Sequence, residues 1–360
     1  MDGQQNIKLT RTITRALVLW VFITCLTFQT QAQDKPIIAS PLQTGHYIPG
    51  IISIRDFADP APASGLVLLD YNIFLSGDKY FDKNGDEVTQ ITGPIGQTSL
   101  NLDVGGYINN PVLMYVSKGK ILGATYIGGI SVPYNTVNVN LAYSRIGLSE
   151  SQDGKTGGDV SGFSDLNVMP GYLSWGMKQF DFTLGYMFFA PTGKYTTGGD
   201  NNTGLGYWSN IFQAFTYYYP MKVKGETSKA LAVMFAPTYE IIGKIKDVDV
   251  TPGNRFSLDY GIDMYFTEKL SVGIFGGNNW QVSDDKGSNV YWDGSVKDKN
   301  GVVGGQIGYW LWPSRLQAIG KYSSSYGSQQ RIKQNMFQIN LTFITNALTG
   351  NKAPKEATGK

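Results

Sequence analysis

The sequence predicts an all-β protein: a transmembrane antiparallel β-barrel of about 12 strands (roughly 12–14), preceded by an extended N-terminal segment. Three observations lead to this fold class. The strand candidates are about 10–14 residues long, which fits a tilted membrane strand better than a soluble one. Short and long connections alternate along the chain. Charged residues make up only 16% of the chain, while aromatics reach 13% and there are 44 glycines, a composition typical of many strands and turns.

The clearest alternation lies in a hairpin between Gly162 and Pro191. In its second half, every other residue from Phe180 to Phe188 is apolar and mostly aromatic, and Asp181 and Thr183 are among the residues between them. A period of two predicts a strand whose two faces meet different surroundings. We expect the aromatic face to meet lipid and the face of Asp181 to line a wet lumen.

Residues 1–32 have the layout of a secretory signal peptide. Lys8, Arg11 and Arg15 precede an apolar run from Ala16 to Phe28 that is too short for an ordinary membrane helix, and Thr30-Gln31-Ala32 suits cleavage. A buried helix or a retained anchor is the alternative. The protein is therefore expected to be exported to the outer membrane of a Gram-negative bacterium, with residues 1–32 removed.

The segment 33–64 is rich in proline and has little periodicity, so it is expected to be extended. The barrel is expected over 65–345, followed by a polar tail at 346–360. The expected strand regions are listed here in chain order: 65–76, 97–109, 120–141 (one or two strands), the hairpin 162–191, 205–219, 229–242, 254–266, 270–280, 301–312, 315–322 and 332–345.

The connections argue for a barrel against a soluble sandwich. Those at Thr267 to Lys269, at Pro313-Ser314 and near Gly176 are very short, whereas long polar loops are expected at 77–96, 150–159, 192–204, 244–253, 283–300 and 323–330. Short turns at one rim and long loops at the other are typical of outer-membrane barrels. A sandwich would have shorter strands and less aromatic faces.

Charge and cysteine content exclude several function classes. The chain has a formal charge of +2, and Asp2, Lys8, Arg11 and Arg15 of the expected signal carry the same +2, so the mature chain is neutral. A neutral chain has no global basic field for nucleic acid. The only cysteine, Cys25, lies within the signal, so no disulfide or thiol chemistry is expected.

Several short motifs, in a fixed order, resemble a known family. They are Gly45-His46-Tyr47-Ile48-Pro49-Gly50, Pro60 to Leu66 leading into Tyr71, Gly162-Phe163-Ser164-Asp165-Leu166, Pro170, Leu173, Trp175, Ala190 to Tyr195, Gly206-Tyr207-Trp208 and Thr216-Tyr217. Together they resemble the SphA-like outer-membrane proteins of the MetA-pathway of phenol degradation, from about Gly45 to Phe343. The resemblance implies a β-barrel that helps aromatic or other hydrophobic compounds across the outer membrane. The chain departs from many such barrels because it continues past its last aromatic, Phe343.

Catalytic and metal chemistry have little support in the sequence. His46 is the only histidine, and no triad motif surrounds it, so a structural role is expected and no enzymatic activity. Zinc and haem sites lack ligands, and the stretch Asp82 to Asp86 lacks the spacing of a calcium loop, so no metal or cofactor is expected.

Polar residues on the strand faces opposite the lipid face are the candidates for the lumen lining. Asp259 and Asp263 lie four apart on one face and are candidates for an ion pair with Arg315 or Lys321. The expected lumen-lining residues are Asn101, Asp103, Asp181, Glu240, Asp259, Asp263, Gln306, Arg315, Gln317, Lys321, Gln338 and Asn340.

The leading hypothesis is a passive outer-membrane channel for small hydrophobic, including aromatic, compounds, with residues 33–64 forming a plug or the substrate path. The alternative is a structural or adhesive barrel that binds partners through its long loops, and a lipid enzyme using His46 is a third. The expected partners are outer-membrane lipid, such solutes, and the barrel-assembly machinery during biogenesis.

Overall fold

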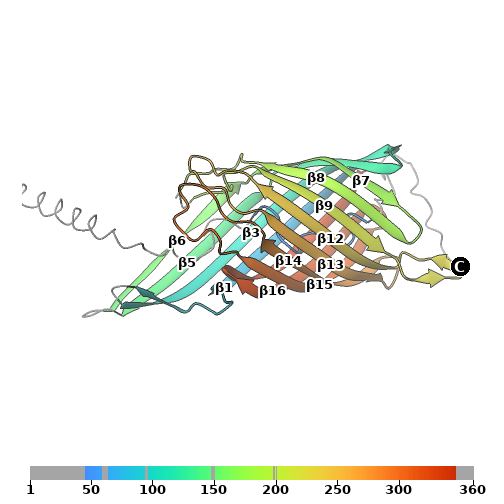
Figure 1. Ribbon diagram of the computed structural model, residues 1–360. Coiled ribbons are helices and arrows are strands. Elements are labelled where there is room, and N and C mark those ends of the chain that lie inside the picture. Colours follow the sequence, from blue (N-terminus) through green and yellow to red (C-terminus); the bar gives the residue numbers. More distant parts are fainter. Residues whose placement is uncertain are drawn as a thin grey trace, which may run out of the picture. The chain divides into compact units, whose positions relative to one another are not determined.

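Twelve antiparallel strands form a closed ring in this protein. The computed structural model describes residues 45–58, 64–93, 96–146, 151–197, 199 and 201–345. The ring closes because β1 pairs with both β17 and β3 (Figure 1). The ring strands are β1 (Gly65–Phe81), β3 (Gly96–Ile121), β4 (Ala124–Ser131), β7 (Leu166–Gly176), β8 (Phe180–Ala190), β9 (Ser209–Tyr218), β12 (Leu231–Ile242), β13 (Arg255–Tyr265), β14 (Leu270–Gln281), β15 (Lys299–Trp312), β16 (Leu316–Gln329) and β17 (Arg331–Ile344). The predicted fold class is confirmed.

The strands bury one face and expose an apolar one. In β1, Val67 and Leu69 are buried, whereas Leu66 and Leu68 between them are 45% and 39% exposed. In β8, Leu184 is likewise exposed while Thr183 is fully buried. In a soluble protein, the exposed positions of these strands would be mostly polar. The exposed apolar face is therefore the one that meets hydrocarbon in a bilayer.

One rim of the barrel carries short turns and the other carries long loops. The short connections lie at 122–123, 177–179, 266–269 and 313–315, and the long ones include 82–95, 191–208, 243–254 and 282–298. Outer-membrane barrels place short turns on the periplasmic side. We call the two ends the short-turn rim and the long-loop rim. The predicted loop at 323–330 is wrong, because β16 continues to Gln329 and the chain reverses at Gln330, with a φ of 52°.

A hairpin extends the sheet beyond the ring at the long-loop rim. It consists of β5 (Tyr134–Ile146) and β6 (Ser151–Phe163), and β5 pairs with the first half of β3 (Figure 1). The predicted loop at 150–159 is therefore wrong. Its Gly-, Asp- and Lys-rich sequence has no apolar period, yet the strand pairs with β5 along its whole length, and side-chain contacts such as Ser161 with Thr136 accompany the backbone pairing.

Three short strands complete the described structure: β2 (Gln90–Gly93), which pairs with β3, and the hairpin of β10 (Lys222–Val223) and β11 (Glu226–Thr227). In the part of the chain that the structure describes, no helix combines the length and the apolar character needed to cross a bilayer. The expected signal peptide (1–32), residues 33–44 of the N-terminal segment, and the tail (346–360) lie outside the described residues.

The hydrophobic core of the molecule lies inside the barrel. Ile54 and Phe57, which precede the first strand, pack against inward-facing Tyr71, Tyr172 and Phe215. Each apolar side chain buried in this way contributes roughly 1.5–3 kcal/mol. Residues 45–58 thus occupy the lumen, and we call them the plug.

Candidate functional site

The plug folds around a tight turn at Ile48–Ile51. The N–H of Ile51 donates to the carbonyl of Ile48 at 3.3 Å, Pro49 is the second residue of the turn, and Gly50 is the third with a φ of 77°. Proline followed by a glycine with positive φ is the signature of a type II turn. A Cβ at Gly50 would also lie 3.0 Å from Val302, so glycine is required here for both reasons.

Buried polar side chains of the wall hold this turn from several sides. The Nζ of Lys321 donates to the carbonyls of Gly50 (2.8 Å), Ile51 (3.2 Å) and Ile52 (2.5 Å), and Gln338 donates to Gly50 as well. Asp259 accepts from the N–H of Gly50 at 2.7 Å and from the hydroxyl of Tyr47. The ammonium and the carboxylate are therefore satisfied by the plug itself, which is what buried charges require.

Toward the short-turn rim the plug is fixed by an ion pair. Arg55 donates through Nε to Asp263 at 2.5 Å, and its other nitrogens donate to the carbonyls of Lys229 and Ala230. Ile54 donates its N–H to Gln306 at 3.2 Å. The turn 53–56 carries its own cap, since Asp56 accepts from the N–H of Ser53 at 2.7 Å.

Toward the long-loop rim the plug ends at His46, which lies between two acids. Its Nε2 lies 3.0 Å from Asp165 and its Nδ1 lies 3.6 Å from Glu240. The ring stacks on Phe189 at 4.3 Å. The hydroxyl of Ser209 donates to the same Glu240 carboxylate. The contacts of His46 therefore join the plug to the wall at the long-loop rim.

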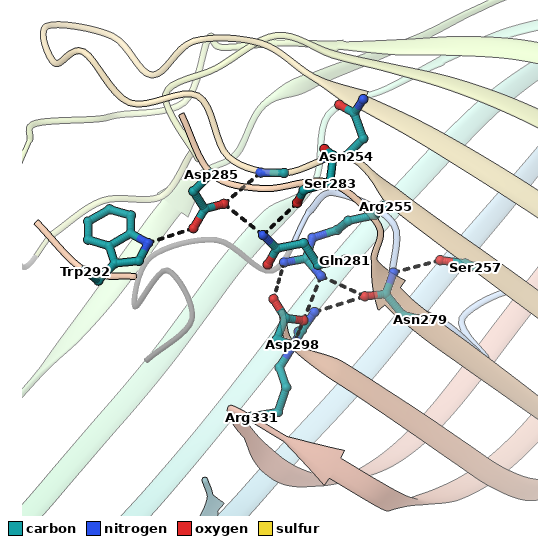
Figure 2. Close-up of polar contacts among 11 residues, drawn as sticks. Asn254, Arg255, Ser257, Asn279, Gln281, Ser283, Asp285, Trp292, Asp298 and Arg331 are labelled. Carbon is teal, nitrogen blue, oxygen red and sulfur yellow. Dashed lines mark hydrogen bonds and ion pairs between the residues drawn. The ribbon is translucent and has the colours of Figure 1, made fainter. Parts of the chain in front are cut away.

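A charged network of side chains lies at the long-loop rim. Asp298 accepts from Arg255 through two nitrogens (2.8 and 2.5 Å) and from Arg331 at 2.7 Å (Figure 2). The side-chain oxygen of Asn279 accepts from Arg255 at 2.9 Å and from Arg331 at 3.0 Å. The side-chain nitrogen of Asn279 donates to the hydroxyl of Ser257. Burial raises the pKa of the Asp298 carboxyl, but the two guanidinium groups outweigh it and hold that pKa below its ordinary value.

The loop 282–298 folds back onto this network through Asp285. This carboxylate accepts from the indole Nε1 of Trp292 at 2.7 Å, from the side chain of Gln281 at 3.0 Å and from the N–H of Gly253 at 2.8 Å (Figure 2). Trp292 is 1% exposed and packs with Tyr207 and Val250. Asp285 thus ties the loop to β14 and to the neighbouring loop 243–254.

Most of the residues predicted to line the lumen point inward and are buried. They bond with the plug, with one another or with other wall side chains, so specific contacts hold the inner face. Asp181, for example, accepts from Lys229 and Tyr219. The buried members are Asp181, Glu240, Asp259, Asp263, Gln306, Lys321, Gln338 and Asn340, and half-buried Gln317 contacts Tyr265.

Three of the predicted lumen residues lie elsewhere. Asn101 and Asp103 are exposed on the same face of β3 as Leu113 and Tyr115, which is the outer face. They are polar because this half of β3 stands beyond the lipid belt, where the outer face meets water. Arg315 lies in the turn after β15, over the ring of Trp312 at 4.3 Å. Asp263 pairs with Arg55 of the plug, and Asp259 accepts hydrogen bonds from the plug.

The sequence reasoning missed Arg55, Arg255 and Arg331. Arg255 shares its strand face with Asp259 and Asp263, so the alternation of β13 was a usable signal. Arg55 lies in an aperiodic segment, which offers no such signal. Among the described residues, no group of three or more His, Cys, Asp or Glu side chains is arranged to hold a metal ion.

Comparison with known families agrees with this architecture. The sequence matches the family described as "Putative MetA-pathway of phenol degradation" over residues 78–341. The chain belongs to this family. The match covers nearly all of the barrel strands and confirms the resemblance inferred from the motifs. No curated protein matches the sequence.

Solved structures include similar barrels. The COG4313 outer membrane channel from Pseudomonas putida F1 superimposes with a TM-score of 0.63 at 14% identity, over 81% of this chain and 99% of that chain. Two other channels are less similar. A Pseudomonas aeruginosa FadL homologue superimposes with a TM-score of 0.39 at 11% identity, over 81% of this chain and 95% of that chain. The CymD monoaromatic hydrocarbon channel superimposes with a TM-score of 0.38 at 9% identity, over 86% of this chain and 98% of that chain. The first of these likenesses establishes the barrel fold.

Proposed function

We propose that this protein is an outer-membrane channel for the passive uptake of small hydrophobic, including aromatic, compounds, and that the plug is its movable barrier. The observation that carries the proposal is a closed barrel with an apolar outer face whose lumen holds a segment of its own chain. The family and the outer-membrane channel with a similar fold support it. Outer-membrane lipid is the proposed surrounding, and the barrel-assembly machinery the proposed route of insertion.

The contacts of the plug suit a barrier that moves as a unit. Its polar groups bond to wall side chains at Lys321 in the middle, at Asp263 toward the short-turn rim, and through His46 at the long-loop rim. Phe57 stacks on Phe215 at 4.4 Å. When the plug is displaced, this aromatic surface becomes free for an apolar solute, and the exposed polar groups gain water. The plug therefore covers an aromatic surface of the wall along which an apolar solute can pass once the plug moves.

We further propose that His46 serves this barrier as a latch and that the protein has no enzymatic activity. Its contacts with Asp165 and Glu240 join the plug to the wall at the long-loop rim. Substituting His46→Gln keeps a hydrogen-bonding side chain but removes the imidazole that lies between the two carboxylates. Such a variant should leave lipid composition unchanged and shorten the closed times of the channel in bilayers.

Uptake into liposomes tests the function directly. Purified protein reconstituted in vesicles should speed the entry of a small aromatic probe such as naphthalene over protein-free vesicles. A variant with a loosened plug, Lys321→Met, should speed it further, and Lys178→Met at an exposed surface pair (Lys178 is 68% exposed) is the matched control. Equal entry rates in vesicles with and without protein would contradict the proposal.

A further inference from the structure

Basic side chains surround the barrel at its short-turn rim. The connections at this rim are 122–123, 177–179, 219–230, 266–269 and 313–315, and each contains a lysine or arginine or begins within two residues of one. The carboxylates in these connections are those of Glu226 and Glu268. We call six of the basic side chains in or next to these connections the basic collar: Lys118, Lys120, Lys178, Lys222, Lys269 and Arg315.

Carboxylates balance only part of the charge of the collar. Lys178 pairs with Glu226 at 3.0 Å, whereas Lys118, Lys222 and Lys269 have no ion-pair partner within the described part of the chain. The long-loop rim differs, because lysines there pair with carboxylates: Lys79 with Glu87 at 2.8 Å, Lys244 with Asp249 at 2.8 Å and Lys297 with Asp284 at 2.7 Å. Unbalanced positive charge is therefore concentrated at the short-turn rim.

Exposed aromatic side chains lie within a few residues of the collar. Tyr115, Phe180, Tyr218, Phe266 and Trp312 are 49%, 43%, 39%, 62% and 47% exposed. Each is no more than four positions from a collar residue along the chain. Amphipathic aromatic side chains mark the level of the lipid headgroups in membrane barrels. The collar is therefore at the level of the lipid phosphates and not far out in the periplasm.

Two neighbouring turns bring collar residues beside an exposed indole. The N–H of Trp310 donates to the carbonyl of Lys269 at 2.9 Å, which ties the strand of Trp312 to the turn of Lys269. That turn is fixed by Thr267, whose hydroxyl accepts from the N–H of Lys269 at 3.2 Å. The guanidinium of Arg315 lies over the Trp312 ring at 4.3 Å. An ammonium, a guanidinium and an indole are thus held at one side of the rim.

We propose that the basic collar binds anionic phospholipids of the membrane leaflet at the short-turn rim. Arginine and lysine bind phosphate oxygens, and an indole packs against the glycerol and the upper acyl chain. A phospholipid with net negative charge, such as phosphatidylglycerol, fits the unbalanced collar better than a zwitterionic one. The bound lipids hold this rim at the depth of the headgroups. The proposal requires a barrel in the membrane and is independent of what crosses its lumen.

Titration with lipids tests the collar. Native mass spectrometry of the purified protein in detergent counts the lipids that it retains. With lipids of identical acyl chains as probes, the wild type should bind phosphatidylglycerol at least about tenfold more tightly than phosphatidylcholine. Raising the salt from about 0.05 M to about 0.5 M should remove most of this preference, because surface charges are screened.

The double variant Lys269→Gln, Arg315→Gln should lower the affinity for phosphatidylglycerol roughly twentyfold, since each basic side chain near an anionic lipid contributes about fivefold. Lys246→Gln, Lys286→Gln is the matched control, because it removes the same charge from exposed positions of the long loops. The control should keep the wild-type affinity for both lipids. A double variant that binds phosphatidylglycerol as tightly as the control would overturn the site at Arg315.

Other occupants of the collar would give different results. Equal affinity of the wild type for the two lipids, at low salt, overturns the proposal. Glycerol 3-phosphate has the charge without the acyl chains and should displace little lipid, so full displacement at equal concentration would make this a site for free phosphate esters. If the wild type prefers neither lipid but sediments with purified peptidoglycan, the partner is the cell wall and the proposal is wrong. None of these results bears on uptake through the lumen.

Discussion

Lys321 is the residue that joins the wall to the backbone of the plug. Its ammonium donates to three successive plug carbonyls and lies over the ring of Phe275 at 4.6 Å. Lys321→Met keeps the side-chain length but removes the donor to the carbonyls of Ile51 and Ile52 and one of the two donors to that of Gly50. We expect a loss of about 3 kcal/mol, or roughly a hundredfold in plug occupancy. We expect higher single-channel conductance in planar bilayers. If the conductance of Lys321→Met equals that of the Lys178→Met control, Lys321 does not hold the plug in the lumen.

Asp298 makes the long-loop rim sensitive to acid. Its pKa is lower in the folded state than its ordinary value of 3.8, so its contribution to stability is complete above about that pH and is lost as the pH falls through the lowered value. We expect protease cleavage of the loop 282–298 to rise between about pH 4 and pH 2 when measured with pepsin.

The substitution Asp298→Asn should remove that pH dependence. It leaves Arg255 and Arg331 buried without their carboxylate, so cleavage should already be fast near pH 4. Asp284→Asn, at a half-exposed pair of the same loop, is the control and should keep the wild-type profile. A wild-type profile for Asp298→Asn would show that the network does not hold the loop.

At the residue scale, the sequence predicted which side chains face inward better than what they touch. The alternation of β13, β16 and β17 placed Asp259, Lys321 and Gln338 on the lumen side, where they lie. Their contacts with the plug are separated by 209 to 288 residues, and no periodic pattern carries such a pairing. Asn101 and Asp103 were wrongly predicted to face the lumen. Polar side chains are expected to point inward only where the outer face of a strand meets lipid.

At the scale of elements, the β5–β6 hairpin is separable from the ring. β4 and β7 pair directly within the ring, while β5 and β6 pair only with each other and with the first half of β3. Replacing residues 134–163 by a short turn should therefore leave a folded barrel. Heat-modifiable migration in SDS gels measures this, and a variant that always runs as an unfolded chain would contradict it.

The same element shows why its strand was not predicted. A strand in the membrane has one apolar and one polar face, and this period is visible in β8 and β17. The second strand of the hairpin has water on both sides, so its sequence is that of a loop. The predicted strands at 65–76 and 315–322 are shorter than β1 and β16. The ends of these two strands pass beyond the lipid belt, so they lack the apolar face that marks a strand in the membrane.

At the scale of the whole molecule, an apolar belt of outward-facing side chains surrounds the ring. Ile274, in the middle of β14, is 67% exposed and faces outward. Ile274→Arg should lower the free energy of unfolding in a bilayer by roughly 2–4 kcal/mol. Reversible unfolding by guanidine in vesicles measures it, and Ile274→Leu should have little effect. Equal stability of the two variants would place this face in water.

The central claim is that the plug must move for a solute to pass. Ser53 of the plug and Asn340 of the wall are in contact at 3.0 Å, and Cys25, the only cysteine, lies in the expected signal peptide. The double variant Ser53→Cys, Asn340→Cys allows the plug to be locked by oxidation. Ser257→Cys, Asn279→Cys, which joins two wall strands at a 2.7 Å contact, is the matched control.

Naphthalene uptake into vesicles is measured for both variants before oxidation, after oxidation and after reduction. We expect oxidation to abolish uptake only for the pair that ties the plug to the wall, and reduction to restore it. Continued uptake through a barrel whose plug is fully cross-linked would contradict the account.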